Sequence, residues 1–294
     1  MNLKDGEFIV SLNGVDHWVK IEGSENETPP LIMIHGGPGG NHYVFERTAG
    51  PLLAKARTVV YYEQRGSGRS QKPKSDRDYS INLLVKDFIE LKKWLGMEKV
   101  DLLGYSFGGE LALEISNAIP AEINQLILSA PSLIYSEIDK MVKITGFMSI
   151  ANTSQSNDIK MLLQEKLDIG EVLTGIWELV GPETVDKLLF ENQIIARKNR
   201  QLWEESNLIN TGKMIEALQS NPVEVPLTKR LNEINHHTLI LTGAFDRNTG
   251  LPIAKILHTN LKNSSLVVFN KSAHFPDLEE TDKFVDVIND FLKA

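Results

Sequence analysis

The chain contains no cysteine among its 294 residues. This absence excludes disulfide bonds, thiolate metal sites and a cysteine nucleophile. No apolar run approaches the roughly 20 residues that a membrane-spanning helix needs. The first residues, MNLKDGEFIVSL, also lack the apolar segment of a signal peptide. We therefore expect a cytoplasmic protein that does not bind membranes.

The sequence is also short of positive charge. It has 31 Lys and Arg residues against 39 Asp and Glu residues, which gives a net charge of −8. Nucleic acids and anionic lipid surfaces need a basic face on their partner, so neither is an expected partner. The chain has no H-E-x-x-H motif or other clustered metal-ligand spacing. We therefore expect no metal and no cofactor, whereas the sequence gives no indication of oligomeric state.

Short apolar runs and amphipathic segments alternate along most of the chain. We expect strands over residues 7–12, 15–21, 31–35, 57–63, 100–105, 123–130, 237–243 and 265–269, and helices over 80–95, 107–118, 251–261 and 281–292. Such alternation predicts an α/β fold whose mostly parallel central sheet carries helices on both faces.

Residues 131–225 interrupt this alternation. They have helical periodicity and almost no runs of β-branched residues. The expected organisation is therefore a core formed by residues 1–130 and 226–294, with an inserted helical cap formed by 131–225 over the carboxyl edge of the sheet.

Ser106 lies in the segment Gly104-Tyr105-Ser106-Phe107-Gly108, which matches the G-x-S-x-G pattern. An expected strand precedes the segment and an expected helix follows it, as in a nucleophile elbow. The turn exposes the serine hydroxyl and places the Phe107 N–H at a helix N-terminus, where it can stabilise an oxyanion. The alternative is that Ser106 only caps the helix.

A glycine-rich loop, His35-Gly36-Gly37-Pro38-Gly39-Gly40, follows the expected strand 31–35. In this position the Gly37 N–H is the expected second oxyanion donor. A phosphate-binding loop is the rival interpretation, but the Lys-Ser/Thr pair and the glycine spacing of such loops are missing.

Two later strand ends supply an acid and a base. Asp246 follows the strand 237–243, and His274 follows the strand 265–269. The chain order Ser106, Asp246, His274 is the order of α/β-hydrolases. His274 is expected to accept the Ser106 proton and Asp246 to orient His274. Asp277 is the main substitute for Asp246, and Asp246 could instead be a simple turn residue.

Together these segments resemble the proline iminopeptidase branch of the α/β-hydrolases. The matching segments are HGGPGG at 35–40, EQRGSGRS at 63–70, GYSFGG at 104–109, GAFD at 243–246 and AHF at 273–275. The resemblance implies a cofactor-free serine aminopeptidase that releases an N-terminal residue, often proline, from short peptides.

The chain departs from that family pattern in three places. Glu63 stands where the family usually has Asp, and Phe107 follows Ser106 where many members have Trp. The cap motif whose glutamates bind the substrate's free amino group is not recognisable. A buried ammonium group needs a carboxylate partner. Glu204 and Glu205, beside Trp203, are the candidates for this role, with Glu191 and Glu216 as weaker ones; all could equally lie on solvated helix faces.

The fold and the triad do not determine the acyl group that is cleaved. The leading hypothesis is a proline iminopeptidase-type aminopeptidase acting on a short peptide or a small molecule through an acyl-enzyme on Ser106. A carboxylesterase or lactonase on the same scaffold is the alternative. A non-catalytic ligand sensor would have no chemical need for Ser106, Asp246 and His274 together.

Overall fold

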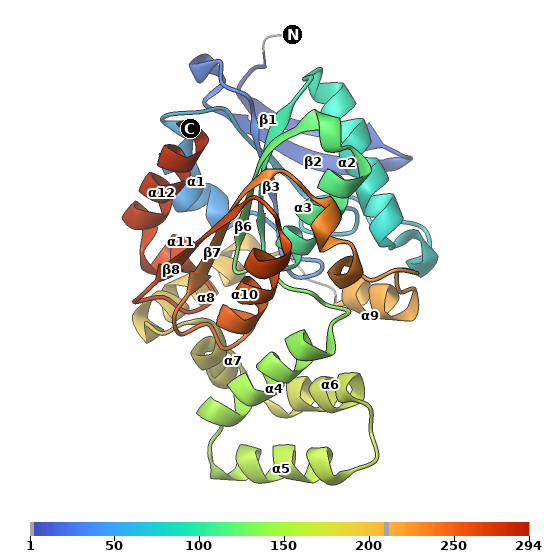
Figure 1. Cartoon of the computed structure of the whole chain (residues 1–294), viewed down its shortest axis with the longest axis vertical. Helices are drawn as coiled ribbons and strands as arrows, with labels where there is room; N and C mark the ends of the chain where they lie inside the picture. The colour runs from blue at the N-terminus through green and yellow to red at the C-terminus, as the bar shows by residue number, and fades with distance from the viewer. Residues whose placement is uncertain (1–2, 209–211, 294) are drawn as a thin grey trace.

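One mixed sheet of eight strands forms the centre of the computed structural model, which describes residues 3–208 and 212–293 (Figure 1). In chain order the strands are β1 (Gly6–Leu12), β2 (Val15–Glu22), β3 (Leu31–Ile34), β4 (Val59–Tyr62), β5 (Val100–Tyr105), β6 (Ile123–Ser129), β7 (His237–Gly243) and β8 (Ser264–Phe269). Their order in the sheet is β1-β2-β4-β3-β5-β6-β7-β8.

The sheet is antiparallel at one edge and parallel everywhere else. Strand β2 pairs antiparallel with β1 and β4, whereas all neighbours from β4 to β8 are parallel. The β1–β2 turn is formed by Asn13 and Gly14, which both have positive φ, as two-residue hairpin loops favour. The predicted mostly parallel α/β sheet is therefore confirmed.

Helices cover both faces of the sheet. The helices of the first face are α2 (Ile81–Leu95), α3 (Phe107–Ala118) and α10 (Gly250–Asn260), and those of the other are α1 (Ala49–Ala54) and α12 (Thr281–Lys293) (Figure 1). Each face of the sheet has its own apolar core, and the side chains of β3 alternate between the two. Ile32 and Ile34 lie in the core formed with α2 and α3. Leu31 and Met33 lie in the core formed with α1 and α12.

Helix α1 is absent from the sequence-based expectation. Its sequence contains Gly50 and Pro51, which are poor helix formers. The helix forms because Ala49 and Leu53 pack into the core beneath the sheet. A Cβ on Gly50 would lie 2.2 Å from the Tyr61 hydroxyl, so glycine allows this close approach. Tertiary packing here outweighs intrinsic propensity.

Six helices lie between β6 and β7 in the described part of the chain: α4 (Glu137–Ile150), α5 (Thr153–Gln164), α6 (Ile169–Leu179), α7 (Pro182–Leu189), α8 (Gln193–Ser206) and α9 (Lys213–Ser220). Helices α4 to α7 share a small apolar core of their own, beyond the end of the sheet (Figure 1). Helix α9 instead packs Met214 and Leu218 into the main core. Within the described ranges no helix combines the length and the apolar content that crossing a bilayer requires.

Candidate active site

Ser106 occupies a sharp turn between β5 and α3. Its backbone has φ 53° and ψ −124°, a conformation that is rare and strained for a residue with a side chain. A Cβ on Gly104 would lie 2.1 Å from the Gly108 carbonyl oxygen, and a Cβ on Gly108 would lie 2.0 Å from that of Ile34. Both flanking positions must therefore be glycine, which is the physical reason for the G-x-S-x-G pattern here.

Two unpaired backbone N–H groups lie next to this turn. Phe107 is the first residue of α3, and Gly37 is an exposed residue of the glycine-rich loop. Neither N–H donates a hydrogen bond to another group among the described residues. The loop contacts the elbow directly, because a Cβ on Gly36 would lie 2.9 Å from the Ser106 Cβ. The arrangement offers two donors to an oxygen that develops negative charge beside Ser106.

His35 holds the glycine-rich loop against the segment that follows β4. Its Nε2 accepts a hydrogen bond from the Gln64 N–H at 3.0 Å, and the Gln64 side chain donates to the His35 carbonyl at 2.9 Å. Burial lowers the pKa of His35 to about 4, so the ring is neutral and can accept this bond. Both ring nitrogens of His35 have backbone partners, the Gly36 carbonyl and the Gln64 N–H, so the geometry makes His35 a support for the loop.

Glu63 ties the chain just after the glycine-rich loop to the 64–70 segment. Its fully buried carboxylate accepts hydrogen bonds from the His42 N–H at 3.1 Å and from Arg69 Nη2 at 2.5 Å. The Arg69 guanidinium also stacks on Trp18, 3.3 Å from the ring centroid. In the sequence this segment is only a family signature, and its supporting role was missed. A run of polar residues directly after a buried strand was the available signal.

Asp246 and His274 come together from the ends of β7 and β8. His274 Nδ1 lies 3.1 Å from Asp246 Oδ2, and both residues are buried. Asp246 Oδ1 accepts hydrogen bonds from the N–H groups of Asn248 and Thr249, and Oδ2 accepts one from the Thr249 hydroxyl. Burial alone would raise the pKa of Asp246, but His274 and these donors outweigh it and hold the pKa below its usual range. The ionised carboxylate therefore keeps a proton on Nδ1 of His274.

Nε2, the other ring nitrogen of His274, contacts the side-chain amide of Asn248. It lies 3.2 Å from Asn248 Nδ2, and within the described ranges no hydrogen bond joins it to Ser106. Sequence reasoning missed Asn248, because nothing in the pattern after Asp246 marks it.

The loop that carries His274 also touches the inserted helices. The His274 N–H donates to the Leu189 carbonyl at 3.0 Å, and the Phe190 and Phe275 rings stack with centroids 4.9 Å apart. Glu279 accepts hydrogen bonds from the N–H groups of Glu191 and Asn192. The segment 189–192 is therefore docked on the loop that carries His274 and on the residues that follow it.

Among the described residues none of the candidate amine-binding glutamates makes a side-chain hydrogen bond or ion pair with Ser106, Asp246 or His274. Glu204 and Glu205 are exposed on α8, and Glu205 accepts a hydrogen bond from Gln201. Glu191 pairs with Arg247 at 2.7 Å, and Glu216 is exposed on α9. Asp277 is buried in α11 (Pro276–Glu279), but the partner of His274 Nδ1 is Asp246. Among the described residues no group of three or more histidines and carboxylates is placed to hold a metal ion.

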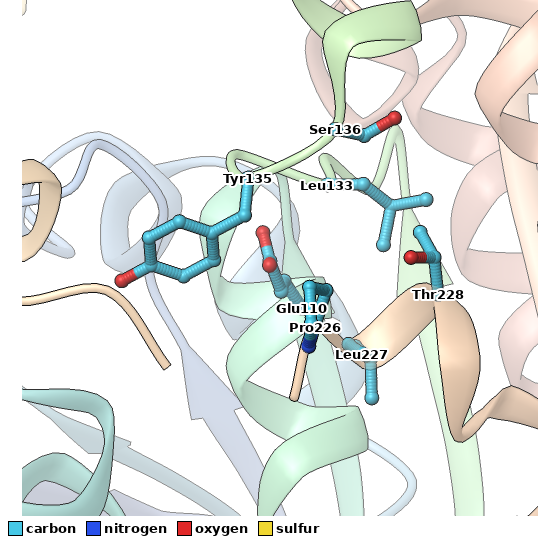
Figure 2. A pocket seen from close by; sticks show the side chains of 7 residues that line it. All are labelled: Glu110, Leu133, Tyr135, Ser136, Pro226, Leu227 and Thr228. Carbon is cyan, nitrogen blue, oxygen red and sulfur yellow. The ribbon is translucent and has the colours of Figure 1, made fainter. Parts of the chain in front are cut away.

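Glu110 lies at the junction between the sheet and the inserted helices. It lines a narrow pocket with residues from both ends of the insertion: Leu133, Tyr135, Ser136, Pro226, Leu227 and Thr228 (Figure 2). Figure 2 shows its carboxyl group pointing between Tyr135 and Leu133, and Oε2 accepts a hydrogen bond from the Ile134 N–H at 2.7 Å. Burial raises the pKa of Glu110 to about 8, helped by Asp139 and Glu114.

This pKa makes the free energy of unfolding depend on pH. The unfolded chain loses the Glu110 proton near the ordinary carboxyl pKa of 4.5, whereas the folded protein keeps it up to about pH 8. The free energy of unfolding therefore falls as the pH rises from 4.5 to about 8. Glu110→Gln keeps an acceptor for Ile134 without the charge. We expect the variant to gain about 1–4 kcal/mol relative to the wild type between pH 5 and pH 9, measured by urea denaturation. If the difference in unfolding free energy between Glu110→Gln and the wild type did not change with pH, the raised pKa of Glu110 would be wrong.

Comparisons with known proteins agree with this architecture. The family model described as "alpha/beta hydrolase fold" matches residues 29–281. A proline iminopeptidase of Saccharolobus solfataricus is 29% identical, with 95% of this chain and 89% of the relative covered, and one of Clostridioides difficile is 25% identical, with 99% of each covered. A solved proline iminopeptidase-related protein of Thermus thermophilus superimposes with a TM-score of 0.82 at 24% identity, covering 99% of this chain and 98% of that one. An esterase of Exiguobacterium antarcticum has a TM-score of 0.70 at 23% identity, covering 98% and 100%.

Proposed function

Because the chain belongs to the α/β-hydrolase fold family and is similar to proline iminopeptidases, we propose that it is a serine aminopeptidase that releases the N-terminal residue of short peptides. The observations that support the proposal are two pairings, one between the loops that follow β5 and β3 and one between the loops that follow β7 and β8. The strained Ser106 turn lies against the glycine-rich loop, and the Asp246–His274 pair is joined at 3.1 Å.

In the proposed reaction Ser106 Oγ attacks the carbonyl carbon of the first peptide bond. His274 Nε2 takes the hydroxyl proton, while Asp246 stabilises the imidazolium that forms. The negative charge on the carbonyl oxygen is met by the N–H groups of Gly37 and Phe107. Collapse of the tetrahedral intermediate breaks the C–N bond, His274 protonates the leaving amine, and water then hydrolyses the acyl-enzyme by the same route.

The proposal assigns the substrate side of the site to residues 131–225, acting as a cap. The contacts of Leu189 and Phe190 with the His274 loop support it, because they join the insertion to the loop that carries His274. The cap has to supply a carboxylate for the substrate ammonium, with Glu204 and Glu205 as candidates.

A carboxylesterase or lactonase is the second candidate. The exposed positions of Glu204 and Glu205 favour it, because an ester substrate needs no partner for an ammonium group. Such an enzyme would use the same nucleophile, base and oxyanion donors.

One set of assays separates the two candidates. We would measure kcat/KM for proline p-nitroanilide, its N-acetylated form and p-nitrophenyl acetate. An aminopeptidase is expected to cleave the free-amine anilide and to lose this activity on acetylation, by about 100-fold or more if a charged pair is removed. Ester cleavage with both anilides inert would reject the aminopeptidase and support the second candidate.

A further inference from the structure

Asn248 lies against the ring nitrogen on which the proposed mechanism depends. Its Nδ2 is 3.2 Å from His274 Nε2, and the residue is only 8% exposed. Its Oδ1 is buried and has no hydrogen-bond partner among the described residues. The side chain is therefore held by one hydrogen bond, the one to His274.

The direction of this hydrogen bond follows from Asp246. The carboxylate keeps the proton of neutral His274 on Nδ1, so Nε2 presents a lone pair and Asn248 donates to it. An imidazole nitrogen has a single in-plane lone pair and accepts one well-directed hydrogen bond. Asn248 therefore occupies the acceptor that Ser106 requires in order to lose its proton.

We propose that Asn248 is a positioning residue that holds the Nε2 lone pair of His274 in the resting enzyme and must release it before Ser106 can react. The proposal rests on the roles proposed above for Ser106 and His274. The bond to Asn248 exists in the ground state and is lost in the transition state, so it lowers reactivity. Among the described residues no second hydrogen bond of the Asn248 side chain has to break when it leaves His274.

The test is the rate of reaction with a fluorophosphonate probe, which reports on Ser106 and His274 without involving substrate specificity. The reaction forms the Oγ–P bond, breaks the P–F bond and releases fluoride, and the hydroxyl proton passes to His274. Asn248→Leu has nearly the shape of asparagine and cannot donate a hydrogen bond. We expect it to raise the second-order labelling rate about 5- to 10-fold, which is the value of one ordinary hydrogen bond.

Asn248→Asp should have the opposite effect. A carboxylate at this position favours a proton on Nε2 of His274, and a nitrogen that already carries a proton cannot take the one from Ser106. We expect labelling to slow at least about 10-fold. A merely structural role for Asn248 would slow both variants, and that result would overturn the proposal.

Two controls complete the experiment. Asn289→Ala removes another asparagine whose buried Oδ1 is unpaired, on α12 outside the site, and should label at the wild-type rate. Nitrogen-15 NMR of the histidine rings should show the Nε2 signal of His274 moving toward that of a free lone pair in Asn248→Leu and in Asn248→Ala, the second variant if the first does not fold. An unmoved signal would reject the hydrogen bond. Labelling of Ser106→Ala at the wild-type rate would instead reject the proposed function itself.

Discussion

Ser106→Ala is expected to lower kcat by at least about 10⁴-fold for every substrate that the wild type cleaves. The reason is that the proposed acyl-enzyme forms on the Ser106 hydroxyl, which alanine lacks. The fold should survive, because the strained turn at φ 53° is maintained by the flanking glycines and by the hydrogen bond from the Ser106 N–H to the Ser129 carbonyl. Steady-state kinetics, with thermal unfolding measured in parallel, would check both expectations.

A matched control is available on the helix that begins at the elbow. Ser116 is buried in α3 and donates its hydroxyl to the Ala112 carbonyl, so it makes only a local backbone contact. Ser116→Ala should keep kcat within about 2-fold, since a local hydrogen bond contributes only about 1 kcal/mol to folding. If Ser106→Ala retained wild-type turnover, the proposed nucleophile would be wrong.

Asp246→Asn should lower kcat by about 10⁴-fold, although it only replaces one carboxylate oxygen by an NH2 group of similar size. Asp246 Oδ1 accepts two backbone N–H groups, those of Asn248 and Thr249, so the amide oxygen of the variant has to remain at that position. The amide nitrogen then faces His274 Nδ1 and donates to it. This forces the ring proton onto Nε2, which leaves no lone pair to accept the Ser106 proton. Pre-steady-state measurement of acylation would test the expectation.

Asp277→Asn provides the comparison for this variant. Asp277 lies three residues after His274, and burial raises its pKa to about 7, with the Glu279 charge adding to the effect and His274 opposing it. Asparagine resembles the protonated carboxyl, and the His274 ring does not depend on Asp277 for its tautomer. We expect turnover within about 5-fold of the wild type. If turnover fell more in Asp277→Asn than in Asp246→Asn, Asp277 and not Asp246 would be the acid that orients His274.

The packing partners of the inserted helices could not be predicted from the sequence. Helical periodicity over residues 131–225 predicts the presence of helices but not the surfaces on which they pack. The structure places Leu189 on the His274 loop and Leu218 of α9 in the main core. Both are contacts between segments far apart in the sequence, and apolar residues on an amphipathic helix do not specify their partner. The amine-binding roles of Glu204 and Glu205 stay predictions for the same reason.

The sequence by itself determined the fold class, because buried parallel strands and their crossover helices carry a strong local pattern in this chain. It also predicted the sharp turn at Ser106, because the G-x-S-x-G pattern lies between an expected strand and an expected helix. Only the tertiary structure decided which groups meet. The support of His35 by Gln64, the pairing of Asp246 with His274 and the amide of Asn248 on His274 Nε2 all depend on distances of about 3 Å between separate loops. Such distances are set by the packing of the whole sheet, and no local pattern records them.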